Sequence, residues 1–209
     1  MHLNILFSYC IHVFFPGKVF AIFKKSAILK RIVQKVTYDR KPIYRRDCMK
    51  LVITMSRRAG TGASAIAKEL SERLDIPVYD KAYLGEALKN SDYEDEADAI
   101  RKLAEKPCII LGRCASHILK DRMNVLNIYI SAPKEFRIQR IMELDSLSYE
   151  DALEVVEKTD SERAAYYHAH TGRAWGDVND YHMIIDSSEI GIDNCANILM
   201  QYFEKKEYI

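Results

Sequence analysis

Residues 51–64 read LVITMSRRAGTGAS, and this stretch decides the fold. Residues 51–55 are apolar or β-branched, which predicts a strand buried on both faces. Gly60 and Gly62 predict a tight loop, because glycine adopts left-handed backbone conformations at little cost. A helix is expected to begin near Gly62, since apolar side chains then recur every four residues. That apolar face is formed by Ile66, Leu70 and Leu74.

A strand, a glycine loop and a helix in this order are typical of a P-loop. The loop directs backbone N–H groups into one concavity, and the helix N-terminus adds positive potential, so a chain of phosphates is held. The pattern GxxxxGK[ST] places Ala63 at the lysine position, Ser64 at the hydroxyl position and Arg57 at the first glycine. A tight turn that only starts a helix is the alternative interpretation. The residues expected to contact phosphate are Gly60, Thr61, Gly62, Ala63 and Ser64.

The rest of the chain alternates short apolar runs with longer periodic stretches, which predicts an α/β fold. Five strands are expected, at residues 51–55, 76–79, 108–111, 125–130 and 183–185. They form a parallel sheet with helices on both faces. With 209 residues, 48% hydrophobic and 29% charged, the chain is an ordinary globular protein rather than a disordered or collagen-like one.

Three further segments predict helices. After Pro133, Phe136, Ile141 and Leu144 are expected to form one apolar helix face. Residues 148–151, Ser-Tyr-Glu-Asp, resemble a capping box that opens a long helix. Residues 85–106 are acidic and helical in character, and are expected to be a solvated excursion.

Charge divides the chain into two parts. Residues 1–50 hold eleven Lys and Arg against two Asp, whereas residues 51–209 hold twenty against twenty-eight Asp and Glu. We expect residues 1–48 to be an N-terminal extension outside the working fold, and residues 49–209 to be the functional domain. The acidic body argues against nucleic-acid binding. The apolar run at residues 3–15 is too short and too interrupted to predict a membrane span. The five cysteines form no CxxC pair, which fits reduced thiols in the cytoplasm.

Residues 49–200 resemble the cytidylate kinase-like family, P-loop proteins related to nucleoside monophosphate kinases. The segments that carry the resemblance are residues 53–57, 60–62, 76–81, 107–114, 132–140, 158–163, 166–167, 171–172, 175–177 and 186–188. The family itself departs from the P-loop lysine. The resemblance implies a P-loop NTPase three-layer fold with a helical lid. It also implies ATP-dependent phosphoryl transfer to a nucleoside monophosphate, CMP or a similar one, with ATP over the glycine loop.

Phosphoryl transfer depends on positioning and on neutralising charge, so arginines are expected to converge on the strand ends. On this reading Arg57 or Arg58 replaces the absent lysine, while Arg113, Arg137 and Arg163 hold the acceptor and the transferring phosphates. The resemblance places three residues on the side of the phosphate acceptor: Asp80, Arg113 and Arg140. A solvated or salt-bridged arginine is the alternative for each position, and a helix N-cap is the alternative for Asp80.

The sequence suggests Ser64 as the metal anchor for Mg²⁺. Related nucleotide kinases carry an Asp where this chain has Leu111, so a carboxylate ligand is missing. His168 and His170 do not share a helix face and do not predict a metal site. For Cys114 the default interpretation is a buried, inert thiol.

Two aromatic residues of the lid-like segment at residues 166–177, Tyr167 and Trp175, either stack on a base or pack in the core. Two other functions remain open: a nucleotide-binding regulatory protein without kinase activity, and a membrane-tethered interaction protein. The sequence does not indicate the oligomeric state.

Overall fold

The computed structural model describes residues 51–87 and 92–209. The predicted extension, residues 1–48, lies outside the described residues, so its separation from the domain stays a prediction. Within the described part of the chain, no helix is both long and apolar enough to cross a bilayer.

A parallel sheet of five strands organises the described residues, in the order β2-β3-β1-β4-β5. The strands are β1 (Val52–Arg57), β2 (Val78–Tyr79), β3 (Cys108–Leu111), β4 (Val125–Ser131) and β5 (Met183–Asp186). The predicted strands are therefore confirmed, although β2 is shortened to two residues. The central strand β1 pairs with β3 on one side and β4 on the other, which explains its nearly continuous apolar run.

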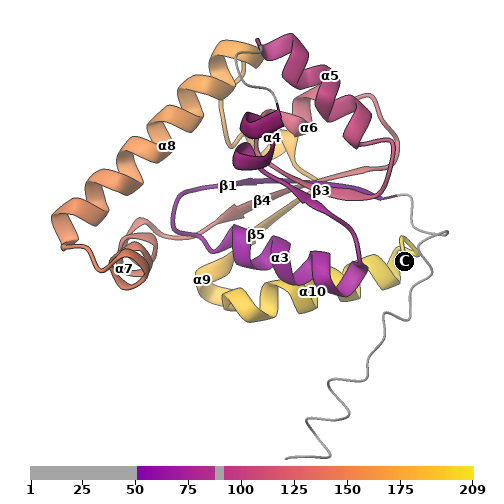
Figure 1. Cartoon of the computed structure of the whole chain (residues 1–209). Helices are drawn as coiled ribbons and strands as arrows, with labels where there is room; N and C mark the ends of the chain where they lie inside the picture. The colour runs from indigo at the N-terminus through magenta and orange to yellow at the C-terminus, as the bar shows by residue number, and fades with distance from the viewer. Residues whose placement is uncertain (1–50, 88–91) are drawn as a thin grey trace, which may run out of the picture. The chain divides into compact units, whose positions relative to one another are not determined.

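One face of the sheet is covered by α3 (Ala63–Leu74), α9 (Ser187–Ile190) and α10 (Ile192–Lys205) (Figure 1). Ile66 and Leu70 of α3 are fully buried against this face, and Leu199 and Phe203 of α10 are buried beside them. The predicted apolar stripe of α3 is thus confirmed. Burial of such side chains contributes about 1.5–3 kcal/mol each and fixes where the glycine loop enters the helix.

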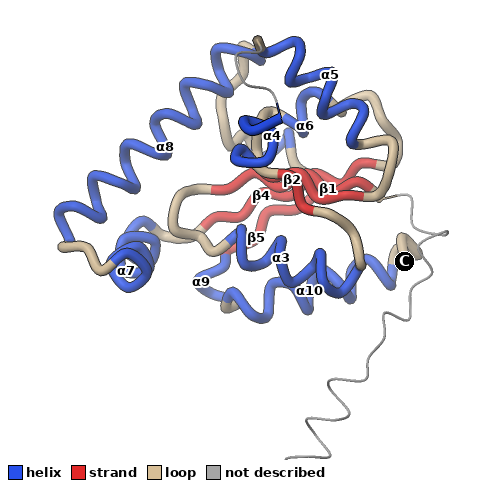
Figure 2. The backbone as a smooth tube through the Cα atoms, in the orientation of Figure 1, coloured by secondary structure: helices blue, strands red, loops and turns tan. Residues whose placement is uncertain are grey.

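The opposite face carries α4 (Lys81–Ala87), α5 (Tyr93–Leu103) and α6 (Ala115–Ile118) (Figure 2). The expectation that residues 85–106 are a solvated excursion is wrong for α5. Ala97 and Ile100 are fully buried, and Glu96 is only 6% exposed. Although the segment is rich in acidic residues, α5 has a narrow apolar face. Ile100 on this face belongs to the same hydrophobic cluster as Leu119.

Two helices, α7 (Lys134–Asp145) and α8 (Tyr149–Thr171), lie at the carboxyl ends of the strands (Figure 1). The predicted cap of α8 is confirmed, because Ser148 accepts from the Asp151 N–H at 3.2 Å. The predicted apolar face of α7 is wrong at Leu144, which is 61% exposed. The buried positions are Arg137 and Ile138, because α7 packs on α8 and the glycine loop instead of on the sheet.

Candidate active site

The loop between β1 and α3 requires glycine at two positions. Gly60 and Gly62 have φ values of 77° and 78°. A Cβ atom on Gly60 would lie 2.5 Å from the backbone oxygen of Arg137, and one on Gly62 would lie 2.5 Å from Ile192 Cδ1. Only glycine therefore permits both this backbone conformation and the close approach of α7 and α10.

The N–H groups of the loop are only partly used by the protein. Arg58 N donates to the Ile130 oxygen at 3.2 Å, and Ala59 N donates to the Asp160 carboxylate at 2.8 Å. The N–H groups of residues 60–63 meet no protein acceptor in the described part of the chain. Gly62 caps α3 without a side chain. These donors and the helix N-terminus together suit an anion.

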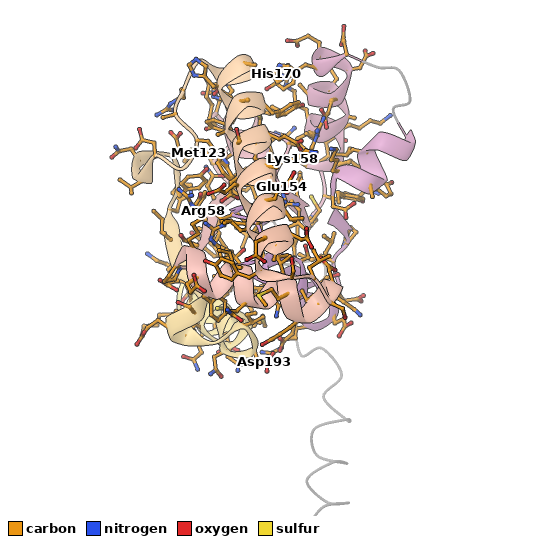
Figure 3. All side chains as sticks on the ribbon, turned by 90° about the vertical axis from the view of Figure 1, so that its left-hand side faces the viewer. Arg58, Met123, Glu154, Lys158, His170 and Asp193 are labelled. Carbon is orange, nitrogen blue, oxygen red and sulfur yellow. The ribbon has the colours of Figure 1, made fainter. Side chains whose placement is uncertain are left out.

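Asp160 of α8 is an anion already held at this loop. Its second carboxylate oxygen accepts from Arg137 Nη1 at 2.8 Å, and Arg58 Nη1 lies 3.6 Å away. Figure 3 shows Arg58 beside α8. Arg137 also donates to the Ala132 and Ala59 oxygens, both at 3.1 Å, and its side chain is 5% exposed. The Arg137 guanidinium is therefore turned to protein acceptors and connects α7, the loop and α8.

A cavity of about 290 Å³ adjoins the ends of β1 and β3, beneath α8. Arg57 from β1, Arg113 from the turn after β3 and Arg163 from α8 line it together, with Lys81 from α4. The structure thus brings together three of the arginines singled out in the sequence. Glu162 also lines the cavity, so the cations exceed the carboxylates among the described lining residues.

Arg57 is the most buried of these cations. Its pKa is lowered to about 10, first by burial and then by the positive charge of Arg163, while the negative charge of Asp80 acts in the opposite direction. The guanidinium remains charged at neutral pH. A Cβ atom on Gly112 would collide with Arg57 Nη1, and Gly112 has a φ of 75°. A side chain at this position would therefore displace the end of the Arg57 guanidinium from its present place.

Arg113 is held rigidly in the turn after β3. It forms hydrogen bonds through Nε and Nη2 to the carboxylate of Glu96, and its Cζ lies 4.4 Å from the centre of the Tyr166 ring. Burial disfavours the charged guanidinium, but the hydrogen bonds and negative charge of Glu96 outweigh it and raise the pKa of Arg113. Tyr166 also donates to Glu96 at 2.7 Å. Arg113 and Cys114 both have a φ of 55°, a strained turn of the kind found at functional sites.

Arg163 lies against Arg57, whereas the remaining predicted site residues are more dispersed. Arg163 Nη1 donates to the Arg57 oxygen at 2.9 Å, and burial is the main cause of its lowered pKa. Asp80 accepts from the Tyr83 N–H at 2.9 Å, which is the N-cap role left open by the sequence. Thr61 is buried and donates to the Arg58 oxygen at 2.9 Å. Arg140 is half-buried on α7, outside the described lining of the cavity.

The described side chains around the loop do not supply a full set of Mg²⁺ ligands, and the expected role of Ser64 as the metal anchor stays a prediction. Ser64 is exposed at the start of α3, and Leu111 is buried where a carboxylate would be expected. The two oxygens of Asp160 are engaged by Ala59 and Arg137. No group of three carboxylate, histidine or cysteine side chains able to hold a metal occurs in the described residues. A Mg²⁺ ion at this place would therefore need oxygen ligands other than these side chains.

The aromatic residues of the lid mainly pack against protein. Tyr167 is 3% exposed and donates to Asp180 at 3.0 Å, while Trp175 meets Tyr129 edge to face at 5.9 Å between ring centres. His170 stacks on Tyr93 with ring centres 4.0 Å apart. Burial raises the pKa of the Cys114 thiol to about 11, as expected of an inert cysteine.

Comparison with known proteins gives a consistent result. The model of the cytidylate kinase-like family matches residues 52–97 and 86–189. A cytidylate kinase of Pyrobaculum islandicum is 26% identical over 174 residues, covering 73% of this chain and 92% of that protein. A cytidylate kinase of Methanosphaera stadtmanae is also 26% identical, covering 75% of this chain and all of that protein.

Solved structures agree on the fold. The crystal structure of an uncharacterized protein from Eubacterium ventriosum superposes with a TM-score of 0.71 at 26% identity, covering 75% of this chain and 99% of that one. Shikimate kinase of Bacteroides thetaiotaomicron superposes with a TM-score of 0.52 at 14% identity, covering 74% and 98%. The predicted P-loop NTPase three-layer fold is confirmed.

Proposed function

The chain belongs to the cytidylate kinase-like family, and on this premise we propose that it is a nucleotide kinase. It transfers the terminal phosphoryl group of ATP to a nucleoside monophosphate, with CMP as the first candidate acceptor. The observation that supports this most strongly is the cavity beside the glycine loop. Arg57, Arg113, Arg163 and Lys81 line it, and a monophosphate dianion is the ligand that such a concentration of cations suits.

The donor phosphates are assigned to the glycine loop. The N–H groups of Gly60, Thr61, Gly62 and Ala63 and the N-terminus of α3 supply the hydrogen bonds. Arg57 faces the acceptor cavity, whereas Arg58 lies on the loop itself with 43% of its side chain exposed. We therefore assign Arg58, of the two, to the role of the absent lysine.

The acceptor phosphate is assigned to Arg57, Arg113 and Arg163. Glu96 and Tyr166 hold Arg113 in one orientation, so little side-chain freedom is lost when substrate binds. Transfer then proceeds by in-line attack of an acceptor phosphate oxygen on the terminal phosphorus, without a covalent enzyme intermediate. The arginines stabilise the charge that spreads over the moving phosphoryl group.

The remaining predicted residues receive different support. Asp80 lies close enough to Arg57 for its charge to raise the pKa of that guanidinium, which favours a place on the acceptor side. Arg137 is assigned to holding the loop and α8 instead of substrate, because protein oxygens occupy its donors. Arg140 is the weakest candidate, since it is outside the described cavity lining.

The test is an enzyme-coupled assay of ADP release by the full chain with MgATP and a panel of CMP, dCMP, UMP, AMP and GMP. We expect turnover with at least one pyrimidine monophosphate. Arg163→Gln should lower kcat/KM at least tenfold, because it removes a buried cation from the cavity. Arg101→Gln, in an exposed ion pair on α5, is the matched control and should retain activity. Absence of turnover with every acceptor would refute the proposal.

A second candidate is a nucleotide-binding regulatory protein without transferase activity. It is favoured by Ala63, which is 2% exposed at the position of the P-loop lysine and supplies no charge. Calorimetry with MgATP separates the two functions. ATP binding without turnover would support the regulatory protein, whereas absence of ATP binding would exclude both functions as proposed.

A further inference from the structure

A second cavity, of about 370 Å³, opens at the other end of the sheet. Val125, the first residue of β4, and His182, just before β5, line it, whereas the candidate active site adjoins the carboxyl ends of β1 and β3. The remaining wall comes from α6 and the turn after it, from Tyr167 of α8, and from the segment between α8 and β5. Met123 at its rim is fully exposed (Figure 3). Its volume lies in the range of small-molecule sites.

The lining of this cavity carries an excess of positive charge. Lys120, Arg122 and Arg173 line it, and Asp180 is the carboxylate among its described lining residues. Asp180 is already engaged, because Arg173 lies 2.6 Å from one oxygen and the Tyr167 hydroxyl donates to the other. Lys120 and Arg122 form no ion pair with a carboxylate of the described residues. Two positive charges are therefore left without a matching acid.

Two side chains of the lining, His182 and Arg122, present hydrogen-bond donors. The Asn127 N–H donates to His182 Nδ1 at 2.9 Å, so a neutral His182 ring carries its proton on Nε2 and can donate there. Arg122 uses Nη1 and Nη2 on the Ala104 and Arg101 oxygens, at 2.7 and 2.9 Å. That anchors its guanidinium beside the cavity and leaves other N–H groups available. The oxygens of a phosphate ligand can accept hydrogen bonds from donors that have no acceptor in the protein.

The charge balance also affects His117, another residue of the lining. Its pKa is lowered, first by burial and then by the positive charges of Lys120 and Arg173. Asp180 and Asp121 act in the opposite direction and do not compensate. Lys120 and Arg173 thus act on a ring whose titration can report a bound anion.

From this arrangement we infer that the cavity lined by Lys120, Arg122, Arg173 and His182 is a second binding site, for a small phosphorylated anion. Its ligand has the size of a pyrophosphate or a nucleotide and binds away from the proposed site of phosphoryl transfer. The inference is independent of the proposed function, since it uses none of the residues assigned to the donor or the acceptor. Tyr167 lines both cavities, so a ligand here lies next to the lid helix α8.

The test titrates the His117 ring by NMR in the full chain, labelled with ¹⁵N-histidine, with and without sodium pyrophosphate. The signal is assigned with His117→Gln. We expect millimolar pyrophosphate to raise the pKa of His117 by about one unit, because a bound anion offsets Lys120 and Arg173. Sodium chloride at the same ionic strength should give a much smaller shift. Equal shifts in the two salts, or none with pyrophosphate, would overturn the inference.

Three variants make the assignment specific. Lys120→Glu should abolish the response to pyrophosphate, whereas Lys68→Glu, the same charge change on α3 across the sheet, should preserve it. Arg163→Gln should also preserve it, even if it disables the proposed active site. A response that persists in Lys120→Glu, or disappears in Arg163→Gln, would contradict a separate site. Parallel titrations with orthophosphate and CDP establish whether the bare phosphate or the nucleotide binds more tightly.

Discussion

Asp160→Asn is the most informative single substitution, because it removes the charge that joins α8 to the glycine loop. Asn retains an oxygen for the Ala59 N–H, but it presents an N–H group where Arg137 now finds a carboxylate oxygen 2.8 Å away. A hydrogen bond to a charged group is worth about 1.5–3 kcal/mol, and breaking a buried ion pair costs about 3–5 kcal/mol. Arg137 keeps two carbonyl acceptors, so we expect a loss of about 2–3 kcal/mol.

The assay is thermal unfolding followed by circular dichroism, supported by urea titration. For a domain of this size, the expected loss corresponds to a fall in Tm of about 5–10 °C. Glu157→Gln is the matched control, because Glu157 lies on the same helix as Asp160 but its ion pair with Lys134 of α7 is exposed. Such surface pairs contribute about 0–1 kcal/mol. If Asp160→Asn unfolds at the same temperature as Glu157→Gln, Asp160 does not hold the loop as we argue.

The other predictions concern the cavity and the thiols. Gly112→Ala should displace Arg57 and raise the KM for the acceptor in steady-state assays, with a smaller change in the KM for ATP. Glu96→Gln should weaken acceptor binding at least tenfold by calorimetry, because Arg113 loses its carboxylate partner. Burial raises the pKa of the Cys108 thiol to about 12, so unfolding releases its proton in the window between pH 9 and 12. The contribution of the protonated Cys108 thiol to the free energy of unfolding should be fully present below pH 9 and decrease above it. Cys108→Ala should therefore reduce the loss of stability at pH 10 by about 1 kcal/mol in urea titrations.

The sheet could be predicted from the sequence because its information is local. Each strand is a short apolar run rich in β-branched residues, and the glycines between β1 and α3 predict the loop. The stripe on α3 has the helical period and packs on the sheet as expected. The predicted apolar face of α7 is wrong at Leu144, because α7 packs on α8 and the loop, and no periodicity within α7 reveals these neighbours.

The partners of the site residues could not be predicted, because they depend on contacts between distant segments. Glu96 lies among many acids in the sequence, and nothing local separates it from its exposed neighbours. Its burial cannot be predicted from the local sequence, because only the fold places Glu96 opposite Arg113. Asp160 is similar, since 101 residues separate it from Ala59. A signal did exist in the spacing of Asp160 and Arg163, which places both on adjoining turns of one helix.

The missing lysine becomes intelligible when the charges around the loop are considered together. A P-loop lysine contributes one positive charge to the donor phosphates. Here Arg58 and Arg137 both lie near the loop, and Asp160 lies between them. Two cations and one carboxylate leave one net positive charge, the same as a single lysine. Arg137 is committed to the protein and Arg58 is the more exposed, so Arg58 is the charge free to turn toward an incoming phosphate. An Ala at position 63 is therefore compatible with a positively charged loop, supplied by side chains from outside the helix.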